Sequence, residues 1–326
     1  MPNAGHPAVR AAVAADLSRR TGVAYGEDSI VMTVGAAGGL NCLLQTLLDP
    51  GDEVLVFAPY FLEYGNYVRN FGGVLRAVPP APPAFQPSAE ALAAMIGERT
   101  KALIVNNPNN PTGVIYSEEA LRAVAAVLEA AAARYGHPIY ILSDEPYRDL
   151  VYDGRHLPSL PSIYRNTLTV FSWSKSLSLP GERIGYLAVP KEAEGAAEIF
   201  AAASISNRIL GFVNAPSLQQ LAVARCLAEQ TDLSGYDRNR RALYEGLTAL
   251  GFTCVYPEGA FYLFLKTPID DKEFVARAKE HRILVVPGSS FACAGYVRIA
   301  YCVSPEQIGR SLPAFAALAE ELGVRR

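Results

Sequence analysis

The chain has 326 residues, half of them hydrophobic, and a formal net charge of −3 at pH 7. This length predicts about two domains, at roughly 150 residues each. A slightly acidic chain is not typical of proteins that bind nucleic acids or acidic membrane surfaces. The sequence has no run of about 18 apolar residues, so we expect no membrane span. Its start has no basic segment followed by an apolar stretch, so we expect no signal peptide either.

The cysteines and histidines are scattered along the chain. The number of cysteines is odd and no pair has the C-x-x-C spacing, so we expect free, buried thiols and a cytoplasmic location. The histidines show no metal-ligand spacing, and we expect no metal site. The residues are Cys42, Cys226, Cys254, Cys293 and Cys302, with His6, His137, His156 and His281.

The first part of the chain alternates short apolar segments with helical ones. Pro7 suits the first turn of a predicted helix, and Ser117 is a good N-cap for a later one. Short apolar strands separated by helices predict an α/β fold, a three-layer αβα domain with a mostly parallel sheet. The expected helices cover residues 7–20, 35–48, 118–133 and 193–203. The expected strands are 30–34, 54–57, 102–105, 139–142 and 168–171, and the proline-rich segment 78–87 is expected to be an extended surface connection.

The pattern changes near residue 235. We expect a helix over 241–250, strands at 283–286 and 297–301, and a last helix from Pro305. Such a mixture predicts a smaller α+β domain. The predicted domains are therefore 1–235, which is large and carries the site, and 236–326.

Most polar motifs follow predicted strands, and ligands of parallel sheets bind at the carboxyl ends of strands. Gly35-Ala36-Ala37 opens a helix, where free backbone N–H groups could bind a phosphate, although a tight turn is the alternative. Phe61, after Pro59-Tyr60, could stack on a flat heteroaromatic ring, with core packing as the alternative. Asn110 lies in Asn106-Asn107-Pro108-Asn109-Asn110-Pro111-Thr112-Gly113, a loop by composition, and could donate to an oxygen of a ligand.

Charged residues mark the other strand ends. Asp144, in Asp144-Glu145-Pro146-Tyr147, would need a cation such as a pyridinium nitrogen, or would cap a helix. Tyr147 could bond the ring oxygen of the same ligand. Lys175 follows a strand within Ser172-Trp173-Ser174-Lys175, a setting suited to an imine-forming lysine. Arg183, eight positions later, could hold a phosphate. Arg298, inside an apolar strand, requires an anion such as a substrate carboxylate or a structural partner.

Together these residues resemble the class I/II aminotransferases, the fold-type I enzymes that depend on pyridoxal 5′-phosphate (PLP). The most specific motifs are Asn110-Pro111-Thr112-Gly113, Asp144-Glu145-Pro146-Tyr147, and Ser172-x-Ser174-Lys175 with Arg183. The resemblance covers nearly the whole chain. It implies amino-group transfer between an amino acid and a 2-oxo acid by a ping-pong route, in amino acid metabolism and biosynthesis.

The resemblance also implies a role for each residue. Lys175 would form the Schiff base with PLP and move the proton. Asp144 would pair with the pyridine nitrogen, Tyr147 and Asn110 with the ring oxygen, and Phe61 would stack on the ring. The phosphate would bind Ala36, Ala37, Ser172, Ser174 and Arg183, and Arg298 with Asn110 would bind the substrate carboxylate.

Family members are usually cytoplasmic homodimers, often with cis bonds before prolines that match Pro59 and Pro111. They usually carry a longer N-terminal stretch before the segment that matches Met1. The resemblance therefore implies either that the start of this sequence is misplaced or clipped, or that the protein has lost those parts. The resemblance leaves two alternatives open: a PLP-dependent C–S or β-lyase, and a non-catalytic remnant. Arg208 could bind a side-chain carboxylate or lie on the surface, and Tyr262 and Phe264 could line the pocket or belong to the core.

Overall fold

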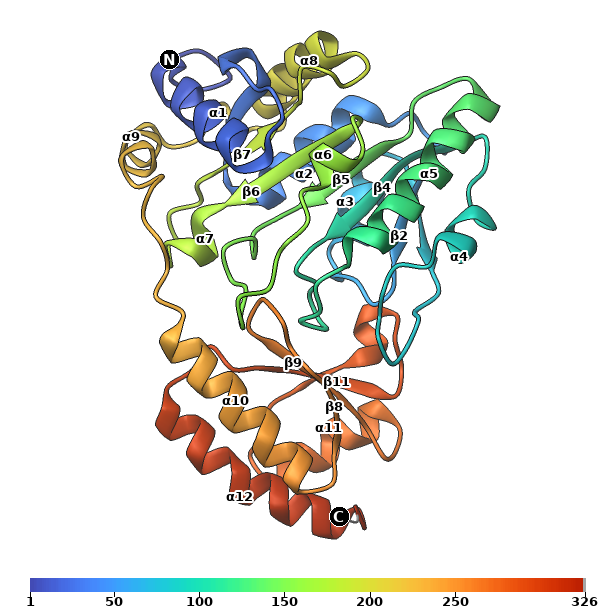
Figure 1. The fold of residues 1–326 in the computed structure, drawn as a ribbon, viewed down its shortest axis with the longest axis vertical. Coiled ribbons are helices and arrows are strands. Elements are labelled where there is room, and N and C mark those ends of the chain that lie inside the picture. Colours follow the sequence, from blue (N-terminus) through green and yellow to red (C-terminus); the bar gives the residue numbers. More distant parts are fainter. Residues whose placement is uncertain (325–326) are drawn as a thin grey trace.

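The computed structural model describes residues 1–324, which form two β-sheets with helices around them (Figure 1). The larger sheet has the strand order β1-β7-β6-β5-β4-β2-β3. Only β7 runs against its neighbours, so the prediction of a mostly parallel α/β sheet is confirmed. Its strands are β1 (Ile30–Thr33), β2 (Glu53–Phe57), β3 (Val74–Val78), β4 (Thr100–Asn106), β5 (Tyr140–Asp144), β6 (Thr167–Ser172) and β7 (Gly185–Ala188).

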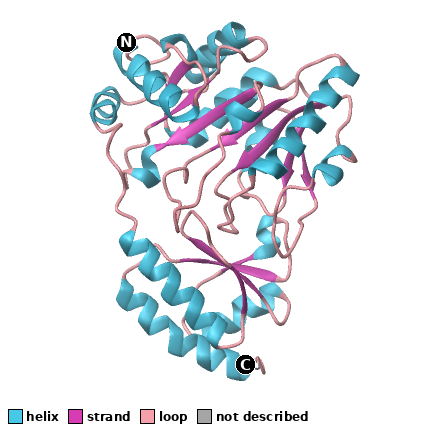
Figure 2. Cartoon of the chain, viewed as in Figure 1, coloured by secondary structure: helices cyan, strands magenta, loops and turns pink. Residues whose placement is uncertain are grey.

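Helices cover both faces of this sheet (Figure 2). Their ends follow from local chemistry: the hydroxyl of Ser117 accepts a hydrogen bond from the Ala120 N–H at 3.1 Å, and Gly136 ends the same helix with φ 73°. The helices are α1 (Pro7–Thr21), α2 (Gly35–Leu47), α3 (Tyr64–Asn70), α4 (Ala89–Ala93), α5 (Glu118–Tyr135), α6 (Leu160–Ile163), α7 (Trp173–Ser176), α8 (Ala196–Ile209) and α9 (Ser217–Arg225), with a 3₁₀ turn at Glu27–Ser29.

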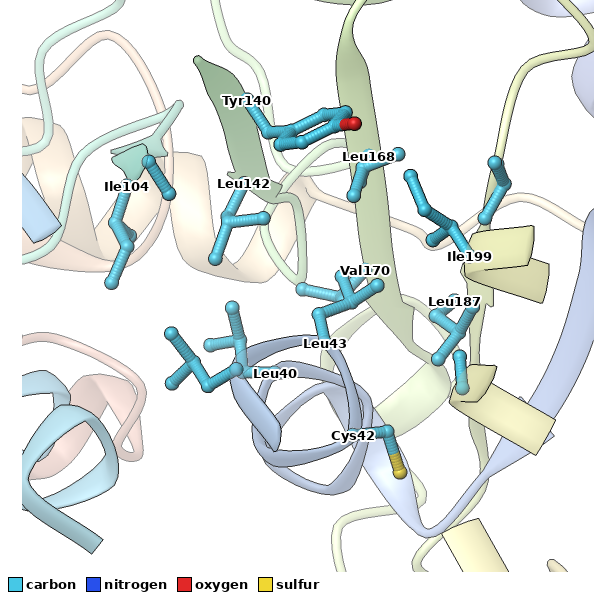
Figure 3. Close-up of a cluster of buried hydrophobic side chains, with 14 of the residues drawn as sticks. Leu40, Cys42, Leu43, Ile104, Tyr140, Leu142, Leu168, Val170, Leu187 and Ile199 are labelled. Carbon is cyan, nitrogen blue, oxygen red and sulfur yellow. The ribbon is translucent and has the colours of Figure 1, made fainter. Parts of the chain in front are cut away.

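Helix α2 packs directly on the centre of the sheet. Leu40 and Leu43 on this helix face Leu142 and Val170 on β5 and β6 (Figure 3). Helix and sheet approach closely at Gly39, where an added Cβ would lie 3.0 Å from Cγ1 of Val170. A side chain at this point would push Val170 aside, so the small residue allows the close approach of α2 to β6.

The second sheet is antiparallel, with the order β10-β11-β9-β8. Figure 1 shows two long helices, α10 and α12, along one side of it. This arrangement confirms the expected smaller α+β part. The elements are α10 (Ser234–Ala249), β8 (Thr253–Val255), β9 (Tyr262–Lys266), α11 (Asp271–Glu280), β10 (Val286–Pro287), β11 (Tyr296–Ala300) and α12 (Pro305–Glu321), with a 3₁₀ turn at Gly288–Phe291.

Two boundaries in this part were predicted wrongly. The expected strand at 283–286 is a strand only from Val286, because Ile283 bonds back to the Ala278 carbonyl at 2.9 Å and Leu284 is exposed. The helix expected at 241–250 begins at Ser234 instead. The first turns of this helix bury Asn239 and Arg240. Because these buried positions are polar, the segment lacks the helical spacing of apolar residues from which a helix is predicted.

The proline-rich segment 78–87 is not a simple surface connection. Phe85 is only 3% exposed. Its ring packs edge-on against Phe264 at 5.7 Å and Tyr296 at 5.3 Å between ring centroids. Through Phe85 the segment packs on the second sheet. The proline-rich composition around it gives no sign of this contact.

The cis bonds predicted before Pro59 and Pro111 are confirmed, and the bonds before Pro83 and Pro108 are also cis. All five cysteines are free, but burial was predicted wrongly for some of them, since Cys302 is exposed. Within residues 1–324, no helix has both the length and the apolar character that crossing a membrane requires.

Candidate active site

A pocket of about 290 Å³ is lined by all the residues predicted to bind the cofactor and the substrate α-carboxylate. It lies where β1, β2, β4, β5 and β6 end and where β11 of the second sheet approaches. This is the edge at which parallel sheets bind ligands. Its lining residues are Ala36, Ala37, Leu40, Phe61, Tyr64, Tyr67, Asn106, Asn110, Asp144, Pro146, Tyr147, Ser172, Ser174, Lys175, Arg183, Tyr262 and Arg298.

Asp144 is the buried acid of this pocket. It is the last residue of β5 and only 6% exposed. Its Oδ2 accepts a hydrogen bond from the Tyr64 hydroxyl at 2.5 Å, while Oδ1 has no partner among the described residues. The alternative of a helix cap is therefore wrong. Burial raises the pKa of this carboxyl to about 7, although the Tyr64 hydrogen bond opposes the shift. A buried carboxylate with a free oxygen is a site for a cation or an N–H donor.

Lys175 is in the short helix α7, directly after β6, and is partly buried. Its Nζ lies 5.2 Å from the centroid of the Phe261 ring. Burial lowers the pKa of the ammonium, and the nearby charge of Arg183 lowers it further. A lower pKa makes the neutral amine more available, as a nucleophile or a proton acceptor requires.

An anion-binding corner lies at the start of α2. The free N–H groups of Ala36 and Ala37 are in the first turn of this helix, at its positive end. Arg183 lies opposite, and its guanidinium bonds to the Pro180 carbonyl at 2.9 Å and the Val34 carbonyl at 3.4 Å. A Cβ at Gly35 would lie only 3.0 Å from Nη2 of Arg183, so a side chain there would fill the corner.

Ser172 and Ser174 complete this corner. The Ser172 hydroxyl accepts the N–H of Ser174 at 3.2 Å and so turns the chain from β6 into α7. The turn places both serines on the pocket wall that also holds Lys175. Hydroxyl donors beside a guanidinium and a helix end suit a phosphate group.

Arg298 brings the second sheet to the pocket. Its Nη1 donates to Oδ1 of Asn110 at 3.0 Å, and its guanidinium lies 4.5 Å above the Tyr262 ring. Asn110 is itself fixed, because its N–H donates to Oδ1 of Asn106 at 2.7 Å. The Nε of Arg298 is buried and has no partner among residues 1–324. A guanidinium with unused donor capacity is suited to a carboxylate.

Tyr147 lies between the two sheets. Its hydroxyl is 3.1 Å from that of Tyr262, and its ring meets Phe261 edge-on at 5.5 Å. Burial raises the pKa of Tyr147 well above its ordinary value, so the hydroxyl stays protonated and can donate. Of the two residues left open by the sequence, Tyr262 lines the pocket, whereas Phe264 is fully buried in the core.

The structure also adds residues that sequence reasoning missed. Tyr64 and Tyr67 on α3, Leu40 on α2 and Asn106 at the end of β4 all line the pocket. Phe61 lies in the loop before α3 and Tyr64 begins this helix, so no sequence period links the two residues, and no sequence signal marked Tyr64. Arg208 is exposed on α8, where it bonds to Asn3 at 3.4 Å, outside the pocket. Among residues 1–324, no group of acidic, histidine or cysteine side chains has the arrangement of a metal site.

Comparison with known proteins agrees with the family that the sequence motifs resemble. The model of the family "Aminotransferase class I and II" matches residues 1–315. The aspartate/prephenate aminotransferase of Thermus thermophilus is 38% identical to this chain, over 97% of it and 82% of the relative. A crystal structure of an aminotransferase from Eubacterium rectale superposes with a TM-score of 0.97 at 42% identity, over 99% of this chain and 81% of the other. The T. thermophilus aspartate aminotransferase with maleate has a TM-score of 0.88 at 37% identity, over 97% and 83%.

Proposed function

Because the chain belongs to the class I and II aminotransferases, we propose that this pocket binds pyridoxal phosphate and that Lys175 and Asp144 carry the transfer of the amino group. The family depends on this cofactor and moves an amino group between an amino acid and a 2-oxo acid. The lyase and the non-catalytic alternatives are not favoured, because the similar proteins are aminotransferases.

The residues present fit the cofactor. The observation that carries the proposal is Oδ1 of Asp144, a buried acceptor without a partner among the described residues and the kind of group that a protonated pyridine nitrogen requires. The corner around Gly35 and Arg183 is the second supporting feature, because a Cβ would fill it. Phe61 lines the same pocket and would stack on the cofactor ring.

When bound, pyridoxal phosphate supplies an aldehyde for the amino group and a ring that accepts electrons from the substrate α-carbon. Lys175 would supply the amine that holds the aldehyde and would accept and return the proton of the substrate α-carbon. Asp144 would pair with the protonated ring nitrogen. Tyr147 and Asn110 would donate hydrogen bonds to the ring oxygen.

Other residues bind the charged ends of the ligands. The N–H groups of Ala36 and Ala37, together with Arg183, would hold the phosphate at the helix end. Ser174 would donate its hydroxyl to the same phosphate, and the Ser172 hydroxyl, which donates to the Ile184 carbonyl at 3.3 Å, would turn from that carbonyl to do the same.

Arg298 binds the α-carboxylate of the substrate with its guanidinium, and Asn110 orients it. Aspartate is the first amino acid to test, since the Thermus relatives act on it by name.

We further propose that the protein is a homodimer. Several large apolar side chains on and between α8 and α9 are exposed, which is unusual for a monomer and typical of an interface. They are Ile205, Ile209, Val213, Leu218 and Leu221. Sedimentation of the purified protein at several concentrations tests this, and a monomer at all of them contradicts it.

The division into domains 1–235 and 236–326 also remains a proposal, supported by the change from the first sheet to the second near α10. A role in biosynthesis in the cytoplasm remains a prediction from the resemblance and from the free cysteines.

The first experiment is the visible absorption spectrum of the purified protein with pyridoxal phosphate, before and after addition of glutamate, beside the Lys175→Ala variant. We expect an absorption band that requires Lys175 and that glutamate removes. A band that no amino acid changes contradicts amino-group transfer. If the wild-type protein gives no band, the proposed cofactor site is wrong.

A further inference from the structure

Tyr64 is the one described side chain that hydrogen-bonds to the carboxylate of Asp144, and none of the roles proposed above uses it. It is the first residue of α3 and only 1% exposed. Its hydroxyl donates to Oδ2 of Asp144 at 2.5 Å across 80 positions of sequence. A short hydrogen bond from a buried hydroxyl to a carboxylate is among the stronger polar contacts in proteins.

The direction of this hydroxyl is set by aromatic packing. The Tyr64 ring stacks on Tyr60 with 6.5 Å between centroids and an angle of 13°. It meets Phe61 edge-on at 5.5 Å and 81°. A donor on a ring held from two sides holds its acceptor in one orientation. Since Oδ2 is occupied in this way, Oδ1 is the oxygen that remains for a ligand in the pocket.

The Tyr64 hydrogen bond helps Asp144 to remain ionised in surroundings that favour its neutral form. Burial raises the pKa of Asp144, and the neighbouring Glu145 raises it further, while the Tyr64 hydrogen bond lowers it. Tyr67 on the same helix and Tyr147 after β5 also face this carboxylate. The cations that line the pocket are Lys175, Arg183 and Arg298, and none of them forms an ion pair with Asp144 among the described residues.

We propose that Tyr64 is a positioning residue that fixes the Asp144 carboxylate through Oδ2 and so presents Oδ1 to the protonated ring nitrogen of the cofactor. The proposal rests on the proposed function, because it assumes that pyridoxal phosphate binds in this pocket. Tyr64 does not touch the reacting atoms; it acts through Asp144.

The test is the Tyr64→Phe holoenzyme, which keeps the ring and removes only the hydroxyl. NMR of ring-labelled pyridoxal phosphate reports whether its ring nitrogen carries a proton. Since a hydrogen bond to a charged group is worth about one pKa unit or more, we expect this proton to be lost about one pH unit lower than in the wild type. We also expect the dissociation constant of the cofactor to rise about tenfold.

Tyr60→Phe is the matched control, because it removes from the stacked neighbour a hydroxyl that makes no hydrogen bond among the described residues. It leaves the Tyr60 backbone N–H, which donates to the Phe291 carbonyl at 3.2 Å, unchanged. It should leave both quantities unchanged. A double-mutant cycle gives a second test: in an Asp144→Asn background, Tyr64→Phe should have little further effect on cofactor affinity.

The outcomes separate the two proposals. If the wild type forms the Lys175-dependent band but Tyr64→Phe titrates and binds like the wild type, the positioning role is wrong and the proposed function stands. The same conclusion follows if Tyr60→Phe has an equal effect, or if the effect of Tyr64→Phe is undiminished beside Asp144→Asn. Failure of the wild type to form the band overturns the proposed function itself.

Discussion

Arg298 Nη1 donates a hydrogen bond to Oδ1 of Asn110 at 3.0 Å, and this contact joins the antiparallel sheet to the loop after β4. The two residues are 188 positions apart in sequence. The substrate end of the pocket therefore forms only when both parts of the chain are in place. A change in the angle between the two sheets would move Arg298 relative to the cofactor residues.

We expect Arg298→Ala to reduce kcat/KM for the amino acid about a hundredfold or more, because a charged pair in a buried site loses one partner. Arg298→Lys should recover only part of this loss, since lysine keeps the charge but not the bidentate geometry. Steady-state kinetics give these values, and cofactor titration should show affinity within about twofold of the wild type. Lys266→Ala, at the exposed end of β9, is the control. A variant of Arg298 with normal kcat/KM would remove this residue from the substrate site.

We expect Asp144→Asn to change the pH dependence of stability in the cofactor-free protein. The folded pKa of Asp144 is raised by burial from 3.8 to about 7, so the folded wild type holds its proton longer than the unfolded chain. The stability of the wild type should therefore fall between about pH 4 and pH 7 and stay level above. The variant has no carboxyl to titrate at this position and so lacks this loss. Its unfolding free energy, relative to that of the wild type, should therefore rise between about pH 4 and pH 7 by at most about 4 kcal/mol.

Urea unfolding at about pH 4.5, 6 and 8 measures the difference in unfolding free energy between Asp144→Asn and the wild type. Glu245→Gln, on the exposed side of α10, should show no such trend. A difference between Asp144→Asn and the wild type that is the same at every pH would mean that burial does not disfavour the charged form of this acid.

We expect Arg208→Ala to leave kcat/KM unchanged, within about twofold, for aspartate and for alanine alike. Arg208 is exposed on α8 and contacts Asn3 instead of the pocket, and surface substitutions of this kind have small effects. Steady-state kinetics with the two amino acids test this. A selective loss with aspartate would instead assign Arg208 to the recognition of a side-chain carboxylate.

We expect Phe85→Ala to destabilise the protein by about 3–5 kcal/mol, because it removes a buried aromatic ring between two others. Denaturant unfolding measures the loss. Pro79→Ala, exposed in the same segment and outside this aromatic cluster, is expected to change stability much less. A small effect of Phe85→Ala would mean that segment 78–87 is a surface connection, as its prolines suggested.

The sequence by itself determined the parts of the site that are local in the chain. Asp144, Lys175 and Arg183 each follow or adjoin a short apolar strand, and parallel strands bring their carboxyl ends to one edge of the sheet. The family motifs added the roles proposed for them. The strand order itself could be expected only in outline, since apolar periodicity gives the type of an element but not its neighbours.

Only the tertiary structure decided which distant side chains meet. Tyr64 bonds to Asp144, Phe85 packs on Phe264, and Arg208 points away from the pocket. Hydrophobic patterning records whether a side chain is buried, whereas its partner depends on how sheets and loops pack, and that is fixed by the sum of many weak contacts over the whole chain.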